Sequence, residues 1–161
     1  MDNKDYDELW EKYSYPFVEK LDKKFDSDWS KLDETEQEIA ALWKLEADVY
    51  MEGFDTFFLN WGYDCYSYAM RGIKRIADAN DGLRKTEVDD VYKLLDNAYQ
   101  KVFARFENDN RIKSYEDIVE YLNEKDEKIL EETYDKFDEK LGPLLFERAY
   151  EYYCGKLNKQ P

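Results

Sequence analysis

The amino-acid sequence predicts an all-α protein that folds as a single compact domain, residues 1–161, of about six to eight helices. In every long segment the apolar residues recur at the helical period, and no segment alternates at the strand period of two. Glycine and proline are scarce, with 6 and 3 copies, and they fall where helices are expected to break. A length of 161 residues fits one domain, and a hydrophobic content of 43% supplies a core.

The first half of the chain is expected to form several helices separated by glycine and proline residues. Pro16 should begin a helix within the segment 5–25, because a first turn needs no N–H group at that place. Asp33 or Thr35 should cap the next helix, which ends before Gly53. Gly72 should allow another helix to approach closely. The expected helices are 34–50, a short aromatic element within 52–62, and 64–77.

The remaining helices are expected to carry much of the charge. A capping box at Thr86 should open a helix that runs to about Phe106. Ser114 should cap the following helix, and a highly charged helix should run from Glu124 to Leu141. Gly142-Pro143 should end that helix before the last one, 144–157.

The charge of the chain restricts its partners. The net charge is -15 and the sequence pI is about 4.5. Such a charge repels nucleic acid and anionic membranes and attracts basic proteins, so we expect no direct nucleic acid binding and no membrane association. No apolar run approaches the roughly 20 residues that span a bilayer. The alternative interpretation is that the charge serves solubility alone.

Residue types that carry catalysis or hold metals are sparse. The chain has no histidine, which removes the usual general base and zinc ligand. Cys65 and Cys154 are too few for a disulfide scaffold, and we expect both to be buried and reduced in a cytoplasmic protein. No glycine-rich phosphate loop or nucleophile elbow is present. The sequence therefore predicts a binding protein rather than an enzyme, with no cofactor and no metal.

An acidic stripe is the strongest candidate for a partner-binding surface. Acids recur every four residues along one flank of the segment 124–141, whereas lysines gather on the opposite flank. The candidate residues are Glu127, Glu131, Asp135, Asp138 and Glu139. Like charges at this spacing destabilise a helix slightly, which is a mild indication that they are used. A merely solvated helix face is the alternative.

Glu46 is the second candidate. It falls inside the apolar arc formed by Ile39, Leu42 and Val49, where a carboxylate is costly unless it is paired. The expected partners are the amides near Gly53, the side chain of Asn60, Arg71 and Arg75. Glu46 then either stabilises the Gly53 turn or lies with Asn60 at the floor of a small pocket.

The stretch from Leu42 to Asn60 resembles the signature of a bacterial family of helical domains that includes an acidic DNA-mimic protein. The matching positions are Glu46, Gly53, Phe54, Phe57, Phe58 and Asn60. Glu52 departs from the pattern, because the family usually has a glycine there. The resemblance is clearest over about 39–106 and looser in the acidic C-terminal helices, about 114–158. It implies an all-helical fold and a homodimer, and it assigns no catalytic role.

These observations lead to one principal hypothesis and two alternatives. The principal hypothesis is an acidic protein-binding module, a DNA mimic that occupies the basic surface of a DNA-binding regulator. The first alternative is a small-molecule or peptide pocket around Glu46 and Asn60. The second is an immunity-like inhibitor of a basic toxin.

Overall fold

Helices form almost all of the fold. The computed structural model describes residues 3–138 and 142–158, and this part of the chain contains α-helices and short 3-10 and π turns but no β-strand. The prediction of an all-α fold is thereby confirmed. No helix in these ranges is long and apolar enough to cross a membrane.

Six α-helices of the described residues are connected in part by short 3-10 and π-helical segments. The α-helices are α1 (Asn3–Glu19), α2 (Glu34–Met51), α3 (Phe54–Asp78), α4 (Gly82–Ala98), α5 (Glu124–Lys136) and α6 (Gly142–Asn158). The π segments are η1 (Lys20–Lys24) and η3 (Tyr99–Phe103). The 3-10 segments are η2 (Trp29–Lys31), η4 (Ala104–Phe106) and η5 (Tyr115–Tyr121).

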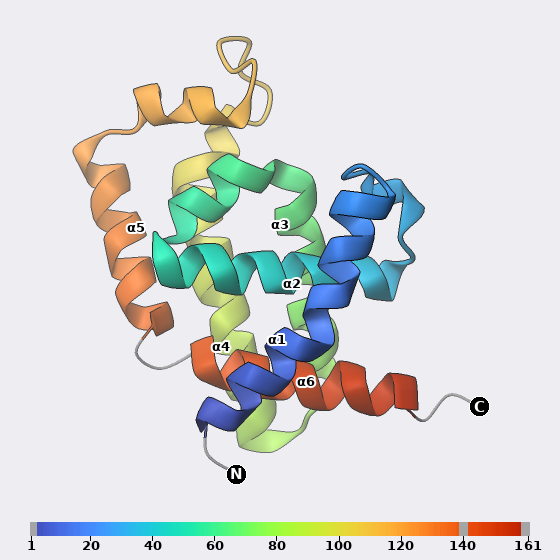
Figure 1. The fold of residues 1–161 in the computed structure, drawn as a ribbon. Coiled ribbons are helices and arrows are strands. Elements are labelled where there is room, and N and C mark those ends of the chain that lie inside the picture. Colours follow the sequence, from blue (N-terminus) through green and yellow to red (C-terminus); the bar gives the residue numbers. More distant parts are fainter. Residues whose placement is uncertain (1–2, 139–141, 159–161) are drawn as a thin grey trace.

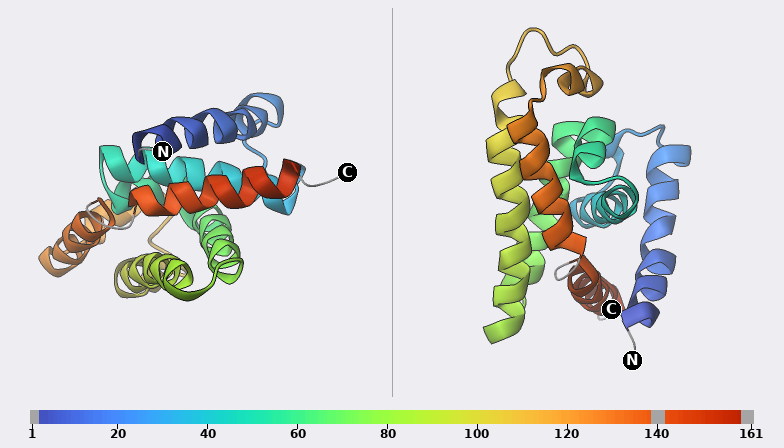
Figure 2. Two further views of the ribbon diagram at one scale, coloured as in Figure 1. Left: turned by 90° about the horizontal axis from the view of Figure 1, so that it is seen from below. Right: turned by 90° about the vertical axis from the view of Figure 1, so that its left-hand side faces the viewer.

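The helix α2 occupies the middle of the molecule (Figure 1). It packs most extensively against α3, and α1 and α6 pack against each other on another side of it. The helices α4 and α5 run side by side, with α5 along one edge (Figure 2). The main core joins all of these helices and includes Trp10, Phe54, Phe103 and Phe146.

Local sequence signals explain where several helices begin. At the start of α2 the Asp33 carboxylate accepts from the amide of Glu36, and Glu36 accepts from the amide of Asp33, which confirms the predicted cap. Ser114 forms a similar capping box with Asp117. The helix that Ser114 opens, η5, is a 3-10 helix rather than an α-helix.

Two of the predicted helix starts, at Pro16 and Thr86, are wrong. Pro16 lies inside α1 instead of beginning a helix. Trp10 and Val18 are buried on either side of the exposed Pro16, so packing against the core maintains the helix through the proline. The helix α4 begins at Gly82, one turn before the predicted capping box at Thr86. The Thr86 hydroxyl instead donates to the carbonyl of Gly82 within that helix.

Glycines shape α3 at two points. Gly62 has φ 74° and ψ -160°, which kinks the helix between its aromatic first part and its longer second part. Gly72 lies where a Cβ atom would be 2.7 Å from the Tyr153 hydroxyl and 3.2 Å from the Glu38 Cβ. The predicted close approach at Gly72 is confirmed, and both α2 and α6 make it.

Candidate partner-binding site

The acidic stripe lies on α5, which an ion pair between a buried carboxylate and an exposed arginine anchors to the rest of the protein. Asn123 and Asp126 form a capping box at the start of α5. Asp126 is only 3% exposed, and its two carboxylate oxygens accept from Arg105 at 2.9 and 2.5 Å. The Arg105 guanidinium lowers the pKa of Asp126 below its ordinary range. This pair fixes α5 against the segment that follows α4.

The predicted stripe residues lie on the outer face of α5. Glu127, Glu131 and Asp135 are exposed on the helix, and Asp138 is exposed just beyond its end. None of them forms an ion pair with another residue in the described ranges. Four residues of α-helix rise about 6 Å, so the first three form a row of free carboxylates.

The helix predicted for 124–141 is confirmed as far as the structure describes it. The α-helix runs to Lys136, and a π-helical segment continues it through the buried Phe137 to Asp138. Residues 139–141 lie outside the described part of the chain, and with them lies the candidate Glu139. The opposite face of α5 buries Leu130 as expected.

The stripe continues across a groove to the turn between α2 and α3. This α5 groove has a volume of about 430 Å³. Its lining residues are Glu52, Gly53, Asp55, Val119, Leu122, Glu127, Leu130, Glu131 and Tyr134. Among the described residues, the lining thus combines apolar side chains with four carboxylates and contains no lysine or arginine. Glu52 and Asp55 were missed in the sequence analysis because nothing local places that turn beside α5.

Glu52, immediately before Gly53, adds a carboxylate to the groove. Gly53 next to it has φ 113°, a conformation that favours glycine, and it precedes α3 as the N-cap. Phe54, Phe57 and Phe58 are buried in the main core. The aromatic motif residues therefore stabilise the fold, and the turn beside them contributes to the groove.

Glu46 does not have the predicted partners. Arg71 and Arg75 instead contact Glu38, with Arg71 Nε 2.6 Å and Arg75 Nη1 3.1 Å from its Oε2. The helices α2 and α3 are joined by a short turn and fold back on each other. The second half of α3 consequently meets the first half of α2, which carries Glu38 and not Glu46.

Glu46 faces α1 across the interface between α1 and α2. Burial raises its pKa to about 8, and the carboxylates of Asp7 and Glu11 add to the rise. The Trp10 indole N–H, a nearby donor, lowers the pKa of Glu46 in part, although it forms no hydrogen bond of full geometry. The other half of the predicted pair, Asn60, is exposed and donates to Asp48 at 3.3 Å.

Neither Glu46 nor Asn60 lines the α5 groove or a second, larger cavity of about 530 Å³ near Phe58. The two cysteines are free thiols, with Cys65 buried as predicted and Cys154 only partly buried. Within the described ranges no group of three or more Asp, Glu or Cys side chains is placed to hold a metal ion.

Comparison with known proteins places the chain in a family. Curated proteins and solved structures provide no match. A family model, described as DMP19-like protein, matches residues 30–156. The matched region contains α2 to α5, most of α6, the aromatic motif and the α5 groove, while α1 precedes it. DMP19 itself is a DNA-mimic protein. The chain belongs to the DMP19-like protein family.

Proposed function

We propose that this protein is an acidic protein-binding module of the DNA-mimic type, which binds through α5 and the α5 groove rather than catalysing a reaction. Its partner is a basic protein, and we infer a DNA-binding regulator. The observation that carries the proposal is the row of unpaired carboxylates on α5, which Glu52 and Asp55 extend across the groove.

The spacing of these carboxylates supports the proposal. Acids four residues apart on a helix are about 6 Å apart along its axis. Phosphates of one DNA strand rise about 3.4 Å per nucleotide and also wind around the axis, so the two separations are similar. Lysine and arginine side chains that contact a phosphate row could therefore contact Glu127, Glu131 and Asp135 in succession. The family membership supports the same mode of binding.

A capture experiment tests the proposal directly. The purified protein is used as bait for a host lysate at low and moderate salt, and bound proteins are identified by mass spectrometry. We expect one DNA-binding protein at both salt concentrations, released by competing DNA. Binding should weaken as salt rises, because exposed charges are screened beyond about 8 Å at physiological ionic strength.

A matched pair of variants separates a specific site from general charge. Glu131→Lys with Asp135→Lys should weaken the captured complex at least about tenfold. Glu8→Lys with Asp90→Lys makes the same change in net charge at exposed positions on α1 and α4. This control should bind as the wild type does. Equal loss in both variants, or capture of only a salt-labile mixture of basic proteins, would refute the proposal.

The identity of the captured protein separates two forms of the proposal. An inhibitor of a basic toxin nuclease would use the same carboxylates, and a captured nuclease would identify that role. A homodimer and a cytoplasmic location are parts of the proposal, and the family resemblance supports the dimer. Light scattering of the purified protein measures its mass, for which two chains of 19.5 kDa are expected.

A further inference from the structure

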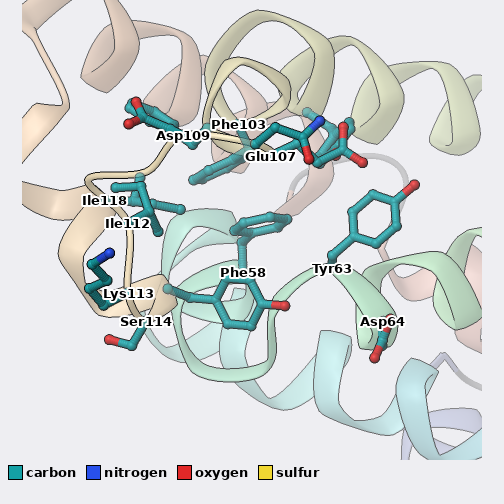
Figure 3. Close-up of a pocket in the computed structure, with 14 residues that line it drawn as sticks. Phe58, Tyr63, Asp64, Phe103, Glu107, Asp109, Ile112, Lys113, Ser114 and Ile118 are labelled. Carbon is teal, nitrogen blue, oxygen red and sulfur yellow. The ribbon is translucent and has the colours of Figure 1, made fainter.

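A second cavity lies on the other side of η5 from the α5 groove. This Phe58 cavity has a volume of about 530 Å³ and is bounded by the first part of α3, η3, η4 and η5 (Figure 3). Tyr115 and Ile118 of η5 line it, whereas Val119 lines the α5 groove. Its volume is in the range of small-molecule sites, about 300–1,000 Å³.

Aromatic rings form much of its wall. Phe58 lies at the centre of the view, and its ring stacks on Phe103 with centroids 4.2 Å apart (Figure 3). Tyr115 meets Phe58 edge to face at 5.9 Å. Tyr63 and Tyr115 are 39% and 41% exposed, so their rings stand at the boundary with solvent. Aromatic faces carry partial negative charge and attract cations.

The kink at Gly62 is required for this wall. A Cβ atom on Gly62 would lie 1.9 Å from Cε2 of Tyr115. The Tyr115 ring therefore lies directly on the backbone of α3. The positive φ of 74° at the same residue is also a conformation that other residues rarely adopt.

Tyr99 supplies a buried polar atom with no well-formed hydrogen bond. Its side chain lines the Phe58 cavity and is only 5% exposed, and its hydroxyl has no hydrogen-bond partner at full geometry. Burial raises the pKa of this hydroxyl, and the Glu107 carboxylate raises it further through its charge and as a poorly aligned acceptor. The Tyr99 oxygen accepts no hydrogen bond from a described residue, which indicates a place where an N–H group of a ligand can bind.

Free carboxylates also border the cavity. Asp64 and Glu107 are exposed and form no ion pair with another described residue, whereas Asp109 is held by Arg111 at 2.6 Å. Glu107 and Tyr63 lie on one side of Phe58, and Lys113, the only basic residue among the described lining residues, lies on the opposite side (Figure 3). Tyr99 lies beside Tyr63 and Glu107, so that side is aromatic and negatively charged.

We propose that the Phe58 cavity binds an organic cation, an ammonium or guanidinium group carried on an alkyl chain. The aromatic faces receive the charge and the chain, and the N–H groups donate to Glu107 and to the Tyr99 oxygen. An anion would be repelled, and a neutral apolar molecule would leave both oxygens unsatisfied. The cation is either a free small molecule or an arginine or lysine side chain of a protein. This site uses none of the α5 acids.

Calorimetric titration of the full chain at constant ionic strength tests the site. The probes are butylguanidinium, its neutral isostere butylurea, and a short peptide with one arginine among neutral residues. We expect saturable binding of one butylguanidinium per chain and no binding of butylurea. Binding of the peptide but not of free butylguanidinium would identify a protein side chain as the source of the cation.

Variants connect the binding to the cavity. Glu107→Gln should weaken butylguanidinium at least about tenfold, and Tyr99→Phe about threefold. Glu8→Gln removes the same single charge at an exposed position on α1, away from both cavities, and should leave binding unchanged. Glu107 is exposed, so its variant should fold normally, and circular dichroism checks this. Equal binding of butylguanidinium and butylurea, equal loss in Glu107→Gln and Glu8→Gln, or no binding of any probe would overturn the proposal. The capture experiment tests binding through α5, so its outcome does not depend on whether the Phe58 cavity binds a cation.

Discussion

The hydroxyl group of Tyr153 donates a hydrogen bond of 2.9 Å to Oε1 of Glu38 and thereby joins α6 to α2 across 115 residues of chain. Both side chains are completely buried. Arg71 and Arg75 contact the other carboxylate oxygen from α3. Burial and the Glu38 carboxylate raise the pKa of Tyr153 well above its ordinary value, so the hydroxyl stays protonated and continues to donate. Three helices thus meet at one carboxylate.

Removal of Glu38 should be strongly destabilising. We expect Glu38→Ala to lower the free energy of unfolding by about 3 kcal/mol, because it leaves the buried Tyr153 hydroxyl without its acceptor and removes the buried carboxylate that Arg71 and Arg75 share. Tyr153→Phe removes only one neutral donor and should lower it by about 1 kcal/mol. Urea denaturation measures both. Glu34→Ala, which removes an exposed partner of Arg75, is the control and should unfold like the wild type. A Glu38→Ala variant as stable as this control would contradict the prediction.

Glu46 should make the stability depend on pH. Its pKa rises from an ordinary 4.5 to about 8 in the folded protein, so the fold binds this proton more tightly than the unfolded chain does. The free energy of unfolding should therefore fall as the pH rises from about 5 to 8. Glu46→Gln keeps the neutral shape and should be more stable than the wild type at pH 8, on the order of 2 kcal/mol.

Thermal unfolding of both proteins between pH 5 and pH 8.5 measures this effect. The gap between wild type and Glu46→Gln should be small at pH 5 and widen with pH. Glu131→Gln changes an exposed carboxyl group and serves as the control, with a profile parallel to that of the wild type. Parallel profiles for Glu46→Gln as well would show that Glu46 ionises normally in the fold.

Gly62→Ala should disturb both the kink of α3 and the Phe58 cavity. The new methyl group would overlap the Tyr115 ring, and the positive φ is unfavourable for alanine. We expect a loss of about 2 kcal/mol in the free energy of unfolding and a rise in the exposure of Tyr115. Gly155→Ala is the matched control, because a Cβ there meets nothing within 4 Å and the residue is helical. Equal stability of the two variants would refute this account of Gly62.

Asp126→Ala should loosen α5 while the rest of the fold stays intact. The substitution removes one half of the capping box, the carboxylate that accepts from the Asn123 amide, and with it the paired partner of Arg105. Amide hydrogen exchange in α5 should become at least about tenfold faster, with little change in α2. Glu127→Ala, one residue further along α5, is the control and should leave exchange unchanged. Acceleration spread evenly over all helices would indicate that Asp126 supports the global fold instead.

The sequence by itself determined the local structure. Its helical periodicity predicted the all-α fold, and Asp33 with Glu36 marked the start of α2, because a cap depends on residues only three positions apart. The close approach at Gly72 was likewise predicted from the residue type at one position of a helix. The local signals were insufficient at Pro16 and Thr86. At Pro16 the packing of Trp10 and Val18 against the core carries α1 through the proline, and at Thr86 the helix has already begun one turn earlier, at Gly82.

The tertiary structure decided which distant side chains meet. Periodicity showed that the Glu46 carboxylate of α2 lies among apolar neighbours. Because α3 folds back on α2, Arg71 and Arg75 form ion pairs with Glu38, and Glu46 faces α1 instead. The same packing brought Glu52 and Asp55 beside the acids of α5 and set Tyr115 over Gly62. Helix propensity acts over three or four residues, whereas the register of packed helices depends on side chains across the whole core.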